Sequence, residues 1–317
     1  MLSKKSNKNL WIVFAALAVI VVILFFFDVG KNERSFREEL VNVDTTAVTE
    51  ILIYPKSMNH KEVRLYKEND KWHVKLDGQK SAAVPAGKIS ALFKQLVEIK
   101  PKKLTARGAG KWNEFQVDST GTRLKVYEDG KETLSLIIGK FAFQQPRSMA
   151  TNVRVDGDTD VYEVDGFLDM IFNQGPNYFR DNNVIKGEYN QWDKVSYIYP
   201  ADSSFQLAKV FDKWSADGGN VDSAEVVNYF RQIYRLTSMN FVDNFDPKTF
   251  SGSTYRLLIA AKDSTIADVT AYVDPTWFVI HSSQNPEAYF DGNVNNLGSK
   301  IFIGKNKLTT KKQVSAK

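Results

Sequence analysis

Three short segments contain residue types that could bind a metal ion or carry out a reaction. The first, Asp156-Gly157-Asp158-Thr159-Asp160, alternates carboxylates as a calcium-binding loop does. The EF-hand pattern also needs a glycine at the sixth position and a glutamate at the twelfth, where this chain has Val161 and Phe167. We therefore interpret the segment as a polar hairpin turn, because Asp and Gly are favoured in such turns.

The other two segments suggest a phosphate loop and a hydrolase, and neither completes its motif. Arg107-Gly108-Ala109-Gly110-Lys111 does not meet the P-loop pattern G-x-x-x-x-G-K-[ST], because one residue separates the glycines and Trp112 follows the lysine. We interpret it as a flexible loop. His281-Ser282-Ser283 lies in no G-x-S-x-G nucleophile elbow. We expect His281 to be a polar residue at the end of a strand.

The composition excludes several classes of chemistry. The 317 residues include no cysteine and three histidines, His60, His73 and His281, which excludes disulfides, thiolate metal sites and a cysteine nucleophile. Because the histidines are scattered, we expect no metal centre, no cofactor and no catalytic residue. A hydrolase stays open as a third hypothesis, although no acid, base and nucleophile converge in the sequence.

The distribution of charge argues against a nucleic-acid partner. Hydrophobic residues make up 43% and charged residues 25% of the chain, as in globular proteins. The net charge of +5 arises at the two ends, in Lys4, Lys5 and Lys8 and in five lysines after residue 304. A nucleic-acid-binding domain would concentrate positive charge on its folded face. We therefore expect no nucleic acid among the partners.

A run of 18 apolar residues, Leu10–Phe27, predicts an N-terminal transmembrane helix. At about 1.5 Å per residue it would span about 27 Å, close to the hydrocarbon core of a bilayer, which is about 30 Å thick. The run is longer than the apolar region of a cleaved signal peptide and ends in bulky residues. We expect a single-pass anchor with residues 1–9 in the cytoplasm and the main domain outside it. Its membrane-contacting residues would include Leu10, Trp11, Phe14, Phe25, Phe26 and Phe27.

An internal repeat is the most informative feature of the remaining chain. Residues 50–55 (EILIYP) match residues 195–200 (VSYIYP), and Lys71-Trp72 matches Lys213-Trp214. A helical apolar stripe follows each match, at a constant offset of 137 residues. The stripes are Ile89, Leu92, Phe93, Leu96, Val97 and Ile99, and Val226, Tyr229, Phe230, Ile233, Tyr234 and Leu236. Pro85 suits the first helix start, and Asp222 with Glu225 resembles a capping box at the second.

Period-two patterns follow each helix and predict antiparallel strands. They cover residues 123–127, 134–138, 152–155 and 161–164, and then 255–260, 269–273, 277–280 and 288–290. Each module is predicted as β-β-β-α-β-β-β-β. The predicted fold is thus α+β, with a transmembrane helix followed by two tandem repeats of an antiparallel sheet packed on one helix. Tyr54, Tyr199, Trp72 and Trp214 recur in both repeats, which favours a structural role.

The predicted domains follow from these boundaries. They are a cytoplasmic tail (1–9), the transmembrane helix (10–27), a juxtamembrane helix or stalk (28–43) with Phe36, Leu40 and Val43 at helical spacing, the first module (44–172), an ordered linker (173–191), the second module (192–304) and a basic flexible tail (305–317).

Several of these segments resemble a family of uncharacterised bacterial membrane-anchored proteins, catalogued only as a domain of unknown function. Members are typically encoded beside genes for a gliding-type ABC transporter. The matching residues are Trp72, Val84-Pro85, residues 112–117 (WNEFQV), residues 137–140 (IIGK), residues 161–164 (VYEV) and residues 179–181 (FRD). The 112–117 segment has Phe115-Gln116 where the family's usual form contains a glycine. The resemblance covers most of 44–190 and, more weakly, 192–304, and implies no catalytic residue.

Two functional hypotheses rank above the hydrolase. The leading one is a non-catalytic scaffold or accessory protein of the bacterial cell envelope, anchored in the inner membrane. The resemblance implies other membrane proteins of an ABC-type complex as its partners, beside the lipid bilayer. The alternative is an extracytoplasmic module that binds a glycan or small molecule between the two repeats, since domain interfaces favour pockets. The sequence does not specify which aromatic residues would form an interaction surface.

Overall fold

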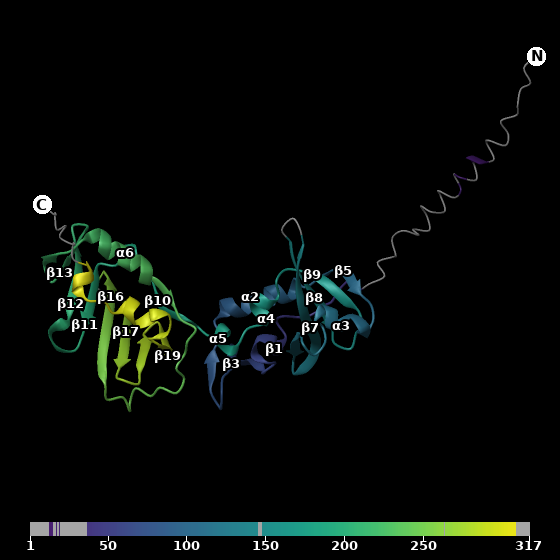
Figure 1. The fold of residues 1–317 in the computed structure, drawn as a ribbon, viewed down its shortest axis with the longest axis horizontal. Coiled ribbons are helices and arrows are strands. Elements are labelled where there is room, and N and C mark those ends of the chain that lie inside the picture. The colour runs from purple at the N-terminus through teal and green to yellow at the C-terminus, as the bar shows by residue number, and fades with distance from the viewer. Residues whose placement is uncertain are drawn as a thin grey trace, which may run out of the picture. The chain divides into compact units, whose positions relative to one another are not determined.

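The structure, a computed structural model, describes residues 13, 14, 17, 19, 37–144, 148–262 and 264–308. These residues divide into two compact units (Figure 1). The first unit contains the described residues up to Glu62 and Ser90–Asn173, and the second contains Val63–Ile89 and the described residues from Gln174 onward. Large antiparallel sheets dominate and helices are few, so the predicted α+β class is confirmed.

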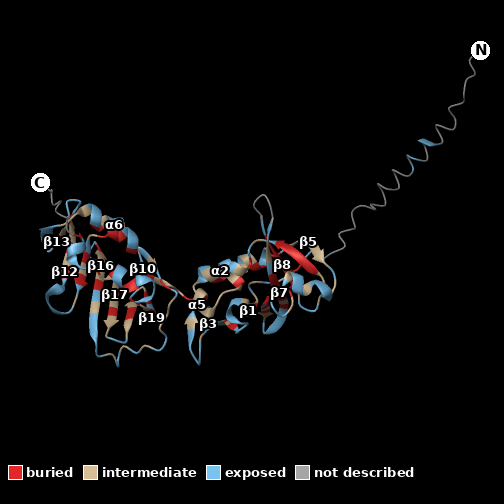
Figure 2. Ribbon diagram, viewed as in Figure 1, coloured by how far each residue is buried: buried red, intermediate tan, exposed pale blue. Residues whose placement is uncertain are grey.

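The first sheet has nine strands in the order β4-β3-β2-β1-β6-β7-β8-β9-β5. Figure 2 shows buried residues in red along strands of both sheets. Ile51 and Ile53 of β1 and Leu124 and Val126 of β6 are buried, while the residues between them are more exposed. This alternation is the predicted period of two. The strands are β1 (Val48–Tyr54), β2 (Val63–Glu68), β3 (Lys71–Lys75), β4 (Ser81–Ala83), β5 (Pro101–Ala106), β6 (Thr122–Glu128), β7 (Lys131–Gln144), β8 (Ser148–Val155) and β9 (Val161–Asp165). The accompanying helices are α2 (Ala86–Val97), α3 (Trp112–Phe115), α4 (Asp169–Phe172), α5 (Pro176–Phe179) and the 3-10 helices η1 (Lys56–Met58) and η2 (Ala109–Lys111).

The second sheet has eight strands in the order β14-β13-β12-β11-β16-β17-β18-β19, and β10 and β15 pair separately. The strands are β10 (Asn183–Lys186), β11 (Lys194–Ile198), β12 (Phe205–Val210), β13 (Lys213–Ala216), β14 (Gly219–Asn220), β15 (Arg235–Thr237), β16 (Ser253–Ala261), β17 (Ser264–Val273), β18 (Phe278–Ser282) and β19 (Asn285–Asp291). The helices are α6 (Ser223–Ile233), α7 (Leu297–Ile301) and the 3-10 helices η3 (Tyr189–Gln191), η4 (Ala201–Ser203), η5 (Val294–Asn296) and η6 (Lys305–Leu308).

The two sheets share one strand order over eight strands. Adding ten to each number in β4-β3-β2-β1-β6-β7-β8-β9 gives the order of the second sheet. Helices α2 and α6 occupy the same place in the chain, directly after β4 and β14. The sheets differ at one edge, because β5 pairs with β9 whereas β15 pairs with β10.

Helix α6 packs on the second sheet through the predicted stripe. Val226, Tyr229, Phe230 and Ile233 are buried in one core with residues of β11, β12, β13, β16 and β17. Asp222 caps the helix, since its carboxylate accepts hydrogen bonds from the backbone N–H of Ala224 and Glu225. The N–H of Asp222 itself donates to the carbonyl of Leu308, so the reciprocal bond of a capping box is not made.

The N-terminal predictions lie largely outside the described residues. No helix in the part of the chain that the structure describes is long and apolar enough to cross a bilayer. The predicted anchor falls on residues that are mostly not described, but Val13, Phe14, Leu17 and Val19 are helical and exposed. Residues 28–43 were predicted as a juxtamembrane helix or stalk; residues 37–43 form no helix, which excludes the first alternative for that part. Leu40 and Val41 are buried there. Their apolar side chains are therefore explained by burial and not by the face of a helix.

Candidate binding site

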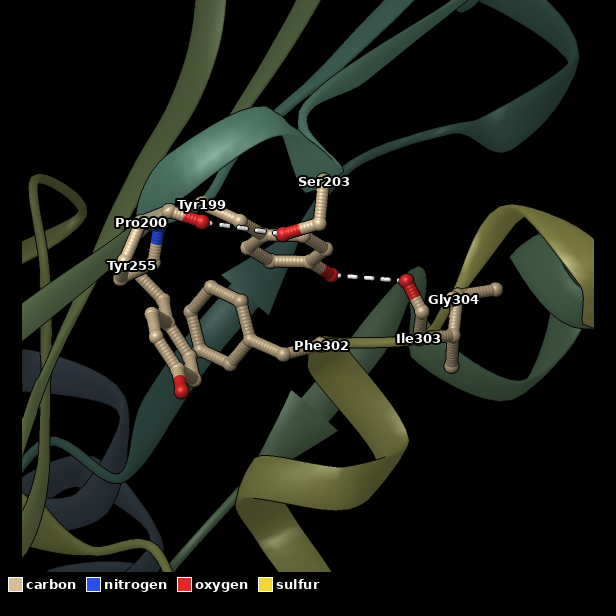
Figure 3. A pocket seen from close by; sticks show the side chains of 7 residues that line it. All are labelled: Tyr199, Pro200, Ser203, Tyr255, Phe302, Ile303 and Gly304. Atoms are coloured by element: carbon tan, nitrogen blue, oxygen red, sulfur yellow. Dashed lines mark hydrogen bonds between the residues drawn. The ribbon is translucent and has the colours of Figure 1, made fainter.

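The end of β11 forms one side of a small aromatic cavity (Figure 3). Pro200 follows the strand and lacks the N–H that would extend the ladder. The chain then turns through η4, where the Ser203 hydroxyl donates to the Pro200 carbonyl at 3.1 Å. The backbone N–H of Tyr199 donates to the Ser204 hydroxyl at 2.9 Å. These bonds fix the Tyr199 ring at the mouth of the turn.

Three aromatic rings from distant parts of the chain meet in this cavity. The ring centroid of Tyr199 lies 5.4 Å from that of Tyr255 on β16 and 6.3 Å from that of Phe302, just after α7. The rings of Tyr255 and Phe302 lie 6.0 Å apart. The cavity has a volume of about 220 Å³. Edge-to-face packing of this kind stabilises aromatic clusters beyond the area that they bury.

The polar groups of the cavity are tyrosine and serine hydroxyls and backbone groups. The Tyr199 hydroxyl donates to the Ile303 carbonyl at 2.8 Å, and burial raises the pKa of Tyr199 above its ordinary value. The hydroxyl therefore stays neutral at physiological pH. The described residues that line the cavity are Tyr199, Pro200, Ser203, Tyr255, Phe302, Ile303 and Gly304, which offer ring faces, hydroxyls and backbone groups.

The corresponding end of β1 carries a second cavity with different chemistry. It has a volume of about 290 Å³ and is lined by Tyr54, His60, Asp118, Ser119, Gly121 and Arg123. Tyr54 pairs across the strands with Arg123, as Tyr199 lies beside Tyr255. Burial and a 2.7 Å hydrogen bond to Glu62 raise the pKa of Tyr54 to about 12. This cavity is thus polar and charged where the first is aromatic.

A third cavity, of about 360 Å³, lies within the second unit. Its described lining comes from residues 82–85, 180–181 and 284–288 and includes no aromatic residue. The sequence-based alternative expects a glycan or small molecule against exposed aromatics between the two repeats. The aromatic cavity at the end of β11 lies within the second unit instead, and its three rings are half-buried.

An exposed apolar surface lies on the first unit, where β7 and β8 pair. We call it the β7–β8 patch, and it consists of Phe143, Met149, Phe167 and Met170, which are 61%, 51%, 37% and 62% exposed. Phe143 and Met149 are cross-strand partners. The N–H of Gly166 donates to the Met149 carbonyl, and the N–H of Met170 donates to the Phe167 carbonyl, so the segment after β9 passes beside the backbone of Met149. Exposed Met and Phe clusters are typical of protein-docking surfaces.

The segments that suggested catalysis have structural roles. Asp158 of the calcium-like loop accepts hydrogen bonds from the N–H of Thr159 and Asp160 at the β8–β9 turn, which confirms the predicted hairpin. The described residues contain no group of three or more acidic or histidine side chains placed to hold a metal ion. His281 lies inside β18, with its ring 5.0 Å from that of Tyr289. Residues 109–111 form the 3-10 helix η2 within the segment predicted as a flexible loop.

Two family-like segments of the first unit pack against each other. Arg154 stacks over the Trp112 ring at 3.8 Å and donates from Nε to the Val117 carbonyl at 2.9 Å. A Cβ on Gly139 would overlap the Phe115 carbonyl oxygen, so no other residue fits there without movement. Gln116 has φ 54°, the left-handed conformation that glycine adopts without strain.

A third family-like segment, residues 179–181, fixes the start of the second unit. Arg180 is buried, and its guanidinium donates two hydrogen bonds to the Asp243 carboxylate, at 2.7 and 2.9 Å. It also stacks over the Phe241 ring at 3.6 Å. The segment thus holds the chain around Arg180 against the chain around Phe241 and Asp243.

The comparison with protein families identifies one domain family. A family model described as a domain of unknown function, DUF4340, matches residues 72–257. The chain belongs to the DUF4340 family. No curated protein and no solved structure matches it. The DUF4340 match begins in β3 and ends in β16, so it includes parts of both sheets.

Proposed function

We propose that this DUF4340 protein is a non-catalytic scaffold or accessory protein of the bacterial envelope, anchored by Leu10–Phe27 in the inner membrane. Its ectodomain would dock on membrane proteins of an ABC-type complex, the partner that the family resemblance suggested. The β7–β8 patch carries the proposal, because four large apolar side chains remain exposed together on a folded unit. The exposed helical residues Val13, Phe14, Leu17 and Val19 support the anchor.

We also propose that the ectodomain is a tandem duplication. Its support is the common order of eight strands, with α2 and α6 at the same place in each, together with the sequence matches at Tyr54-Pro55 and Tyr199-Pro200. Duplication of a docking scaffold leaves one copy free to change its surface, which accounts for the different cavities at the ends of β1 and β11.

Co-purification tests the docking proposal. The tagged full chain is recovered from native membranes in mild detergent, as wild type, as the patch variant Phe143→Ser/Met149→Ser, and as the control Met58→Ser. Met58 is an exposed methionine of the same unit. We expect subunits of an ABC-type transporter with the wild type and the control, and their loss with the patch variant. Equal recovery with all three chains would refute docking through the patch.

The anchor has its own test. Removing residues 1–27 should move the chain from the membrane pellet to the supernatant, while the full chain stays in the pellet. A truncated chain that still sediments with membranes would show that the anchor is not what holds the protein there.

A second candidate function is ligand binding at the end of β11. The specific observation is the meeting of Tyr199, Tyr255 and Phe302 around one cavity, since aromatic ring faces bind sugar rings. Calorimetric titration of the full chain with peptidoglycan disaccharides would give heat of binding that Tyr255→Ala removes and Tyr66→Ala leaves unchanged. No heat with the wild type would remove this candidate.

A further inference from the structure

The turn between β12 and β13 places an aromatic residue where the backbone disfavours one. Phe211 and Asp212 are its two central residues, with φ 46° and 62°. Two-residue hairpin turns with both φ values positive favour Asn, Asp and Gly, and a bulky residue in this conformation is an outlier. Phe211 is also 97% exposed, and the neighbouring Val210 is 53% exposed. Neither the backbone nor packing accounts for this phenylalanine.

The first sheet contains a corresponding hairpin turn with which this turn can be compared. Residues 67–72 (KENDKW) correspond to residues 209–214 (KVFDKW), and Asn69 and Asp70 have φ 50° and 62°. Both turns are closed by the same ion pair, Lys67 to Asp70 at 3.1 Å and Lys209 to Asp212 at 3.0 Å. The two hairpins therefore have one geometry, and Glu-Asn is sufficient to form it. The Val-Phe pair at the second tip is an addition that the fold does not require.

The charge around the two tips also differs. The backbone N–H groups of Lys209 and Lys262 both bind Asp193, which places the β12–β13 and β16–β17 turns at one end of the sheet. The described residues at this end include four lysines and two aspartates, namely Lys194, Lys209, Lys213, Lys262, Asp193 and Asp212. At the corresponding end of the first sheet, Lys67, Lys71 and Lys131 face Glu68, Asp70, Glu128 and Asp129. The sequence also places Asp263 directly after Lys262. The count is then four lysines and three aspartates here, against three lysines and four acidic residues at the other end, so the tip with Phe211 is the more basic one by two charges.

We propose that Val210 and Phe211 form a membrane-contacting tip, which inserts into the interfacial region of a bilayer containing anionic lipids. An aromatic side chain is favoured at that depth, and lysines are attracted to anionic headgroups. Two side chains are too small for a specific protein interface, which buries about 800 Å² on each partner. The inference goes beyond the proposed scaffold function and depends on it only because the anchor brings the bilayer within reach.

A site-specific fluorescent probe tests this tip, since the chain has no cysteine. Lys213→Cys, beside the tip, is labelled with an environment-sensitive dye, and Lys71→Cys is the matched control on the other hairpin. The full chain is reconstituted in vesicles of phosphatidylcholine and phosphatidylglycerol that carry nitroxide-labelled acyl chains. We expect a blue shift and quenching at residue 213 and neither at residue 71. Adding Val210→Glu/Phe211→Asn should abolish both effects, because the inserted tip then no longer buries two apolar side chains. We expect the ratio of inserted to free tip to fall roughly tenfold or more.

Two results would refute the proposal that the tip contacts the membrane. The first is that the probe at residue 213 is not quenched although the chain floats with the vesicles. The same result is expected if the tip docks on a protein. The other is equal quenching with and without the Val210→Glu/Phe211→Asn change. Flotation reports the anchor separately, so failure of the tip and failure of the anchor are distinguished in one sample. Thermal unfolding of the double variant checks that the hairpin still folds.

Discussion

Replacing Gly139 by alanine tests whether the family-like segments form one packed unit. The added Cβ would overlap the Phe115 carbonyl oxygen and would lie 2.6 Å from Val117 Cγ1 and 2.9 Å from the Gln116 carbonyl oxygen. Two of these neighbours are backbone atoms, and the Val117 carbonyl is held by Arg154, so the segment cannot move without breaking that bond. Overpacking a core costs about 1–3 kcal/mol, and we expect a loss of about 3 kcal/mol here.

The assay is urea unfolding of the full chain in detergent, followed by far-ultraviolet circular dichroism. Gly87→Ala is the control, because a Cβ at Gly87 meets nothing within 4 Å and the residue lies in α2. Alanine is favoured over glycine in helices by up to about 1 kcal/mol, so the control should be neutral or stabilising. If Gly139→Ala lowers the free energy of unfolding by less than about 1 kcal/mol, residues 115–117 can move to make room for the added Cβ, and the reasoning is refuted.

Three further substitutions have defined outcomes. Asp222→Ala removes the cap of α6 and should lower the free energy of unfolding by about 1 kcal/mol in urea titrations; no change would mean that the cap is replaced by solvent. Phe211→Asn should raise the melting temperature, because it relieves about 1 kcal/mol of left-handed strain without removing packing; a lower melting temperature would contradict the exposed position of the ring. The pKa of Tyr54 is raised from 10.0 to about 12 by burial and by Glu62, so between those values the folded chain keeps a proton that the unfolded chain loses, and stability falls as the pH rises through this window. Tyr54→Phe should make that fall shallower in unfolding curves measured from pH 9 to 12, and an unchanged slope would refute the assignment.

The long elements of the fold were predictable because their periodicity is local. The alternation at 123–127 and 134–138 gave β6 and β7, and the stripe from Val226 to Ile233 gave α6. The short strands β4, β5, β14 and β15 were missed, since two to six residues such as Pro101–Ala106 carry no alternating pattern. Their pairing depends on partners far along the chain, as in β5 with β9.

The candidate sites were less predictable than the fold. Tyr199 was noticed as a repeated residue, but Tyr255 and Phe302 join it only through tertiary packing. The turn at Asp156-Gly157 was predicted from its residue types, whereas Phe211 is not a turn residue and gave no such signal. Extending the match of Lys71-Trp72 with Lys213-Trp214 by four residues toward the N-terminus would have found it. The β7–β8 patch could not be inferred, because the sequence alone does not separate exposed apolar residues from buried ones.

Photo-crosslinking in native membranes tests docking through the β7–β8 patch most directly. A photoreactive phenylalanine analogue replaces Phe143 in the patch, and the same analogue at Met58 serves as the control. We predict that irradiation links residue 143 to a subunit of an ABC-type transporter and that position 58 gives no such product. An identical set of products from both positions, or none containing a transporter subunit, would contradict the proposed docking.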